Sequence, residues 1–74
     1  MPRNQIQPAT PMAPHQQRVV AEREELVHKI DKLTEFLKGD TFKSLPADEQ
    51  DRLNRQLAIM EQYSNVLAER IVHF

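Results

Sequence analysis

The sequence predicts an all-α fold: an antiparallel two-helix hairpin that carries an irregular N-terminal tail and assembles as a homo-oligomer. The chain has 74 residues, one glycine and no cysteine, so we expect one small domain without disulfide bonds. Two long segments repeat apolar residues every three or four positions, which is the period of a helix. A chain this short needs well-packed helices or association to be stable, and we favour association.

Residues 1–13 read MPRNQIQPATPMA and contain three of the five prolines. They show no helical or strand period, so we predict a disordered tail. The first helix is predicted over residues 14–38. Pro14 suits the first helical position because the N–H that it lacks has no partner there. Gly39 is expected to end this helix as a left-handed cap.

Residues 39–45 form the predicted linker, which includes one helical turn. The second helix is predicted over residues 46–73, and together these elements make a hairpin domain of residues 14–74. Pro46 suits the first turn of the second helix. The acidic residues that follow it complement the positive end of the helix dipole.

Each predicted helix carries a seam of apolar residues through which the two helices are expected to pack. Arg23 takes an apolar position in the first seam, and Ser64 does so in the second. Both polar positions lie toward the middle or open half of the hairpin, away from the linker. The first seam consists of Val19, Arg23, Leu26, Ile30, Leu33 and Leu37. The second consists of Leu53, Leu57, Met60, Ser64, Leu67, Ile71 and Phe74.

A second stripe recurs beside the seam of the second helix, and a lone hairpin cannot bury both. Exposed apolar rows usually mark an interface. We therefore predict that this stripe contacts other copies of the hairpin or a partner helix. Short helical units are marginal alone, which favours self-association. The stripe consists of Gln56, Ile59, Tyr63, Val66 and Arg70.

Composition and charge argue against several classes of function. Ten Lys and Arg against eleven Asp and Glu give a formal net charge of -1, without the basic excess that duplex nucleic acid binding needs. The sequence lacks both an apolar run of about 20 residues and a secretory signal, so we expect a cytoplasmic protein without a membrane partner. The histidines are too dispersed for a zinc site, and no nucleophile or acid–base pair is visible. We expect no metal, no cofactor and no catalysis.

Several side chains are suited to an anionic ligand. The first helix begins with HQQR, which is rich in hydrogen-bond donors where helices usually place Asp or Glu. Tyr63 and Arg70 lie on one face of the second helix, where tyrosine can stack on a base and arginine can bind a phosphate. A structural role stays open for each: Tyr63 as a half-buried interface residue, and Arg70 in an intersubunit ion pair. Arg18 and Arg23 could likewise pair with carboxylates such as Glu69.

The pattern as a whole resembles a phage family. The matching segments are HQQRVVAEREELVHKIDKLTEFL, LPADEQDRL and RQLAIMEQYSNVLAERI, with Phe42 and the final aromatic residue. They resemble the helical-hairpin domain shared by phage anti-CBASS and anti-Thoeris proteins, over about residues 14–74. The His-Gln-x-Arg-Val start and the Gln, Met, Tyr, Leu, Arg-Ile series match beyond generic heptads. The Gly-Tyr-Arg-Glu-Leu segment of better-known members is absent.

The resemblance implies a non-catalytic sponge, an oligomer that is often a hexamer. It implies that cyclic di- or trinucleotide signals of bacterial defence systems are sequestered in the host bacterial cytoplasm, in pockets between protomers. On this resemblance, Gln17 contributes a hydrogen bond and Arg18 binds a phosphate. Arg23 is the candidate second cation, Arg70 binds phosphate, and Tyr63 stacks on a base. The alternative function is a helical adaptor or inhibitor that binds a host protein through the second stripe.

Overall fold

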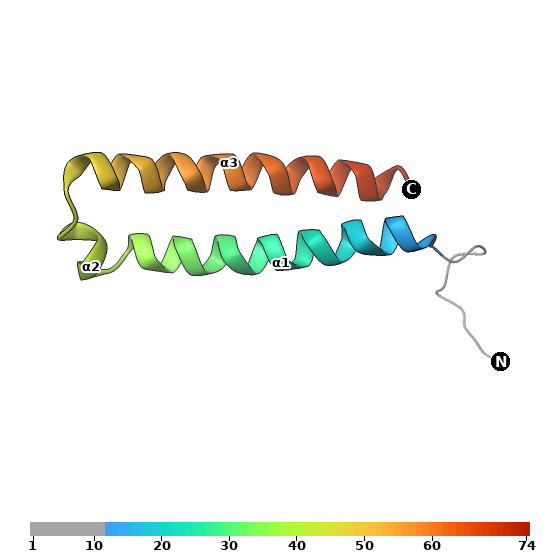
Figure 1. Ribbon diagram of the computed structural model, residues 1–74, viewed down its shortest axis with the longest axis horizontal. Coiled ribbons are helices and arrows are strands. Elements are labelled where there is room, and N and C mark those ends of the chain that lie inside the picture. The colour runs from blue at the N-terminus through green and yellow to red at the C-terminus, as the bar shows by residue number, and fades with distance from the viewer. Residues whose placement is uncertain (1–11) are drawn as a thin grey trace.

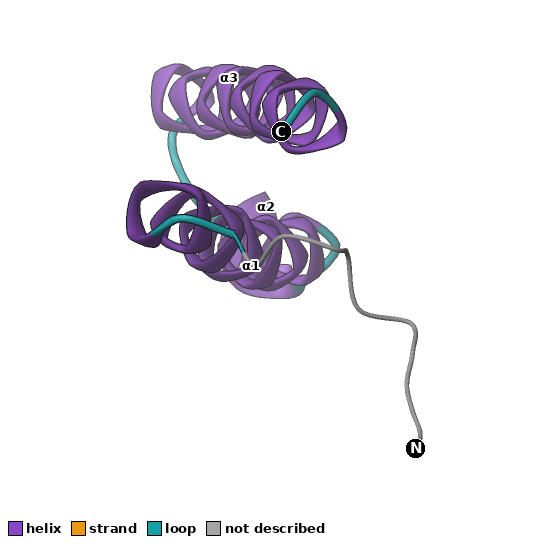
Figure 2. Ribbon diagram, turned by 90° about the vertical axis from the view of Figure 1, so that its right-hand side faces the viewer, coloured by secondary structure: helices purple, strands orange, loops and turns teal. Residues whose placement is uncertain are grey.

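The computed structural model describes residues 12–74. The predicted tail therefore lies outside the described residues, apart from its last two. The described part of the chain contains three helices and no strand: α1 (Pro14–Leu37), α2 (Asp40–Lys43) and α3 (Ala47–Val72). This confirms the all-α class. The two long helices lie side by side and are joined at one end through α2 (Figure 1). The start of α1 and the end of α3 share the other end, which we call the open end (Figures 1 and 2).

The start of α1 follows from local sequence. Pro14 occupies the first helical position, where its fixed φ suits the helix. Gln16 fixes the boundary because its side-chain oxygen accepts a hydrogen bond from the Ala13 backbone N–H at 2.9 Å. No acidic residue occurs in the first turn, so this end of α1 presents donors without a compensating carboxylate.

The end of α1 differs from the prediction. The helix ends at Leu37, and Lys38 keeps a right-handed helical conformation with φ -87°. Gly39 has φ -92° and ψ 171°, which is extended backbone, so the predicted left-handed cap is wrong. The physical reason is that α2 begins directly after Gly39. The residue before a helix adopts an extended conformation, and this requirement replaces the cap of α1.

The one-turn helix α2 reverses the chain between the long helices. Gln50 at the start of α3 donates from Nε2 to the backbone oxygens of Lys43 at 3.3 Å and Leu45 at 2.9 Å. Phe36 and Phe42 pack edge to face with ring centroids 6.3 Å apart. These contacts tie α2 to both long helices. α3 then begins one residue later than predicted.

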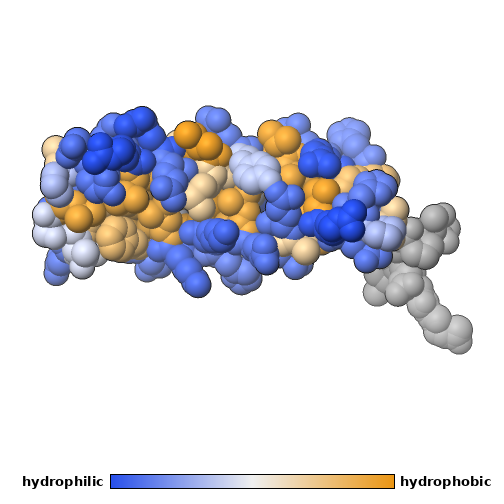
Figure 3. Space-filling model, viewed as in Figure 1, coloured by the Kyte–Doolittle hydropathy of each residue, from blue (hydrophilic) through white to orange (hydrophobic). Residues whose placement is uncertain are grey.

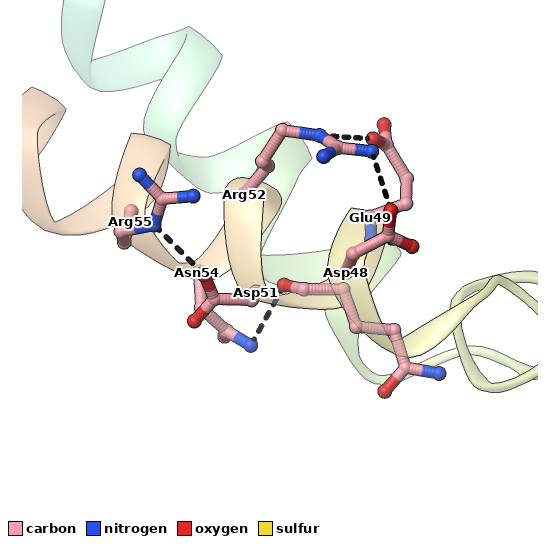
Figure 4. Close-up of polar contacts among 7 residues, drawn as sticks. Asp48, Glu49, Asp51, Arg52, Asn54 and Arg55 are labelled. Atoms are coloured by element: carbon pink, nitrogen blue, oxygen red, sulfur yellow. Dashed lines mark hydrogen bonds and ion pairs between the residues drawn. The ribbon is translucent and has the colours of Figure 1, made fainter.

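Ion pairs support the first turns of α3 (Figure 4). Arg52 contacts Asp48 at 3.5 Å and Glu49 at 2.8 Å. Arg55 contacts Asp51 at 2.9 Å. All three pairs join exposed side chains three or four residues apart on one helix, and such pairs contribute about 0.3–0.5 kcal/mol each. They therefore favour the helix without holding it to α1.

The core lies between α1 and α3 in the half of the molecule nearer the open end. Its most buried side chain is Leu67, at 1% exposure. The cluster consists of Val19, Leu26 and Leu67, with Ile30, Met60 and Ile71 packed against it. These six residues all belong to the two predicted seams and confirm that part of them. Phe74 is an exception: it follows the end of α3 and is 41% exposed, because the helical period stops before it.

Candidate functional site

A polar contact joins α1 to α3 beside the core. Arg23 is half-buried and donates from Nε to the backbone oxygen of Ser64 at 3.3 Å. Ser64 is buried, at 5% exposure, and its small side chain leaves room for the arginine. A guanidinium has five N–H donors, and this contact uses one. Within residues 12–74 Arg23 forms no ion pair.

Two exposed arginines lie close to the open end, Arg18 on α1 and Arg70 on α3. The contact between Arg23 and Ser64 aligns the two helices. Counting five residues from this contact toward the open end reaches Arg18 on α1 and Glu69 on α3. Arg18 therefore lies at the same height along the pair as Glu69, which is the neighbour of Arg70. Arg18 directly precedes Val19, and Arg70 directly precedes Ile71, both of which pack in the core. Because the start of α1 and the end of α3 lie at the same end, positions just before a core residue fall on the same side of the helix pair.

Neither of these arginines has an ionic partner in the described part of the chain. Its four ion pairs all lie between Glu35 and Arg55, in the half that contains α2. The predicted structural alternative, in which Arg18 or Arg23 pairs with Glu69, does not occur among these pairs. The open end therefore presents two guanidinium groups that can accept an anion as partner.

An exposed apolar ridge runs along α3. The exposed fractions are 64% for Ile59, 43% for Tyr63 and 51% for Val66, and the spacing of four and three residues places them on one face. Gln56 and Arg70 extend this row at its two ends and are exposed. We call these five residues the α3 ridge. Apolar patches interrupt the polar surface over α3 (Figure 3), so the predicted second stripe is uncovered in the single chain.

Gln17 takes a different position. It is exposed, and its Nε2 donates to the backbone oxygen of Met12 at 2.9 Å. It precedes the core residue Val19 by two positions, which places it on the side of α1 away from α3. The helical positions thus place Arg18, Arg70 and the ridge residue Tyr63 on one side of the helix pair. They leave Gln17 apart from these residues within one chain.

Sequence reasoning missed the acceptor for Arg23. It expected a carboxylate or an anionic ligand, whereas the acceptor is the backbone oxygen of Ser64. The pairing of a small seam residue with a seam arginine is the signal that could have indicated it.

The described residues of one chain enclose no pocket, and no cluster of three metal-ligating side chains occurs among them. Each helix described in the structure is too short or too polar to span a bilayer.

Comparison with known proteins places the helices in a family. Residues 13–73 match the family model described as Sequestin. The chain belongs to the Sequestin family. The family name indicates a sequestering role, and the match covers all three helices and each of the five candidate ligand residues.

A relative of this Sequestin chain comes from a phage. The chain is similar to a protein of Enterobacteria phage T4 described as an uncharacterized 7.5 kDa protein in the denB–rIIB intergenic region. The two are 36% identical over 63 residues, which covers 85% of this chain and 98% of the relative. No solved structure gives a significant match to this Sequestin sequence. The predicted resemblance therefore holds in its coarser form, a sequestering family with a phage relative.

Proposed function

We propose that the chain binds and sequesters cyclic di- or trinucleotide second messengers of bacterial defence systems without cleaving them. It then acts as a phage anti-defence protein of the anti-CBASS type in the cytoplasm of the host bacterium. One observation carries the proposal: Arg18 and Arg70 are exposed and without ionic partners among residues 12–74, on the same side as Tyr63. The Sequestin match supports the sequestering role.

These side chains suit the chemistry of a cyclic nucleotide. Arg18 and Arg70 offer planar donor groups that bind phosphate oxygens in pairs. Tyr63 offers a ring on which a base stacks, and this side chain is 43% exposed in the single chain. Arg70 lies two helical turns from Tyr63, which is about 10 Å along the helix. The same surface can therefore contact a phosphate and a base of one ligand.

Arg23 and Gln17 complete the proposed set. Arg23 uses Nε for the contact with Ser64, so its terminal amino groups serve as the second source of positive charge at the junction. Gln17 donates its amide N–H to Met12 and keeps its side-chain oxygen for a base or backbone donor. Because Gln17 lies on the other side of α1, it serves a ligand held by a neighbouring copy.

The proposed ligand site lies between copies of an antiparallel hairpin. A single chain encloses no pocket in its described part, and a nucleotide site usually buries most of its ligand. Assembly into a homo-oligomer, a hexamer by resemblance, supplies the missing walls. Sequestration is stoichiometric, so the affinity must exceed that of the host effector for the same signal.

Isothermal titration with a panel of cyclic di- and trinucleotides, after sizing by light scattering, tests the proposal. We expect a Kd below about 1 μM and fewer than one ligand per chain. Arg18→Ala and Arg70→Ala each remove a charge-assisted contact and weaken binding by about 10-fold or more. Arg52→Ala is the matched control, because Arg52 is an exposed cation already paired with Asp48 and Glu49. An oligomer that binds no member of the panel would refute the proposal.

A helical adaptor is the second candidate, and the exposure of Ile59 and Val66 favours it. An amphipathic helix can present such a row to a groove in another protein. Affinity capture from host lysate separates the two functions. Under the adaptor hypothesis, Ile59→Asp abolishes capture of a host protein and added cyclic nucleotides have no effect. Under the sponge hypothesis, heat releases cyclic nucleotides from the purified protein.

A further inference from the structure

We propose that two copies of the chain pair through their α3 ridges, with the two α3 helices running in opposite directions and a two-fold axis at Tyr63. This pairing follows from the ridge itself and does not depend on the ligand. It places Tyr63 in the interface, so within the pair a base reaches only the part of the Tyr63 ring that the second copy leaves uncovered. One consequence, the assignment of Gln56 to the ligand site, rests on the proposed function.

The ridge needs a cover that the single chain does not supply. Only Val19, Leu26 and Leu67 are buried apolar side chains in the described part of the chain, which is a small core for helices of 24 and 26 residues. Meanwhile Ile59 and Val66 keep 64% and 51% of their surface exposed. Burial of this surface stabilises by about 25 cal/mol per Å², so covering the ridge adds to a marginal core.

A second copy fits the ridge because similar residues lie at similar distances before and after Tyr63, so two ridges that run in opposite directions are complementary. Ile59 lies four residues before Tyr63, and Val66 lies three residues after it. A two-fold axis at Tyr63 therefore places Ile59 within one residue, about 1.5 Å along the helix, of Val66 of the second copy, and Val66 equally near its Ile59. Both are β-branched aliphatic residues of similar shape. This reciprocal pairing is what an isologous interface requires.

Charge selects the opposite orientation of the two helices. Arg70 and Gln56 lie seven residues on either side of Tyr63, so opposite directions place each Arg70 against a neutral Gln56. Helices running in the same direction would place Arg70 beside Arg70 of the second copy. That arrangement adds repulsion between like charges and aligns the two helix dipoles unfavourably.

The pairing gives each Arg70 a neighbouring amide from the second copy. Arg70 has no ionic partner within residues 12–74, and the Gln56 side chain offers both a donor and an acceptor. If the proposed function holds, a phosphate bound by Arg70 brings its nucleotide within reach of Gln56 of the second copy. The pair then contains two equivalent junctions, one at each end of the ridge.

Cysteine cross-linking tests the pairing, because the chain has no cysteine of its own. Helices in contact are 8–10 Å apart between axes, which brings facing Cα atoms within the range of a disulfide. Under mild oxidation Tyr63→Cys should form a covalent dimer by itself. Ile59→Cys and Val66→Cys should each stay monomeric alone on a denaturing gel, and a mixture of the two should form the dimer.

Glu61→Cys is the matched control. It is exposed and lies two residues from Tyr63, on the opposite side of α3, so it should give only background cross-linking. Circular dichroism of each variant confirms that its helices are retained. If Ile59→Cys and Val66→Cys each dimerise alone as readily as Tyr63→Cys, the opposite orientation is wrong. If none of the ridge variants cross-links more than Glu61→Cys, the pairing itself is wrong.

Gln56→Ala tests the ligand assignment separately. We expect a several-fold loss of cyclic nucleotide affinity in titration, with Tyr63→Cys cross-linking unchanged in the Gln56→Ala background. Unchanged affinity removes Gln56 from the site. If the unmodified protein binds no cyclic nucleotide, the proposed function and the Gln56 assignment fail together, and cross-linking still decides the pairing.

Discussion

Leu67→Ala is the substitution expected to destabilise the helix pair most. Leu67 is 1% exposed and packs in the cluster with Val19 and Leu26. The change removes three carbon groups beyond Cβ, which at about 0.8 kcal/mol each amounts to about 2.4 kcal/mol. A residual cavity adds to this loss because neighbouring side chains relax only in part. We expect the free energy of unfolding to fall by about 3 kcal/mol.

Urea denaturation followed by far-UV circular dichroism measures this change. The chain concentration must be the same for each protein, because association contributes to apparent stability. Val72→Ala is the control on the same helix. Val72 is 80% exposed, so its truncation should change the free energy of unfolding by no more than about 0.5 kcal/mol. A loss below about 1 kcal/mol for Leu67→Ala would show that Leu67 is not the centre of the core.

Three further substitutions separate local features. Ser64→Ala keeps the backbone oxygen that Arg23 contacts and removes a buried hydroxyl, so denaturation should show a gain of about 0.5 kcal/mol; a loss above 1 kcal/mol would indicate a bonded hydroxyl. Arg23→Met keeps the apolar stem, so stability should stay within about 1 kcal/mol while titration shows about 10-fold weaker nucleotide binding. Unchanged affinity would exclude Arg23 from the site. Gly39→Ala should change stability by less than about 0.5 kcal/mol, because φ is -92° and a Cβ meets only the Phe36 backbone oxygen at 3.5 Å. A left-handed glycine would instead lose about 1–2 kcal/mol.

The helices were predictable because their signals are local. Pro14 and the three-and-four spacing indicate α1 without reference to the rest of the chain, and α1 does begin at Pro14. Gly39 was misread because a glycine after a helix is usually a left-handed cap. Here the requirement of the next helix decides its conformation. Phe74 was misread because periodicity does not show that α3 ends at Val72.

The candidate site was predictable only in part, because it depends on contacts between distant residues. The spacing of Tyr63 and Arg70 places them on one face of α3 from sequence alone. The position of Arg18 beside the end of α3 can be inferred only when the alignment of α1 with α3 is known. The contact between Arg23 and Ser64 supplies that alignment. The acceptor in that contact is a backbone atom, and every residue has one. The small seam residue Ser64 therefore indicates at most where Arg23 makes its contact, and the side-chain pattern does not identify the acceptor atom.

The distribution of charge along the helix pair connects stability with the proposed function. All four ion pairs in the described part of the chain lie between Glu35 and Arg55, around α2. Exposed ion pairs contribute little to stability, so leaving Arg18 and Arg70 without partners costs the fold little. A phosphate that reaches these arginines then displaces no carboxylate. Because the α3 ridge shares this side of the molecule, a ligand held between copies would stabilise the assembly that forms its site.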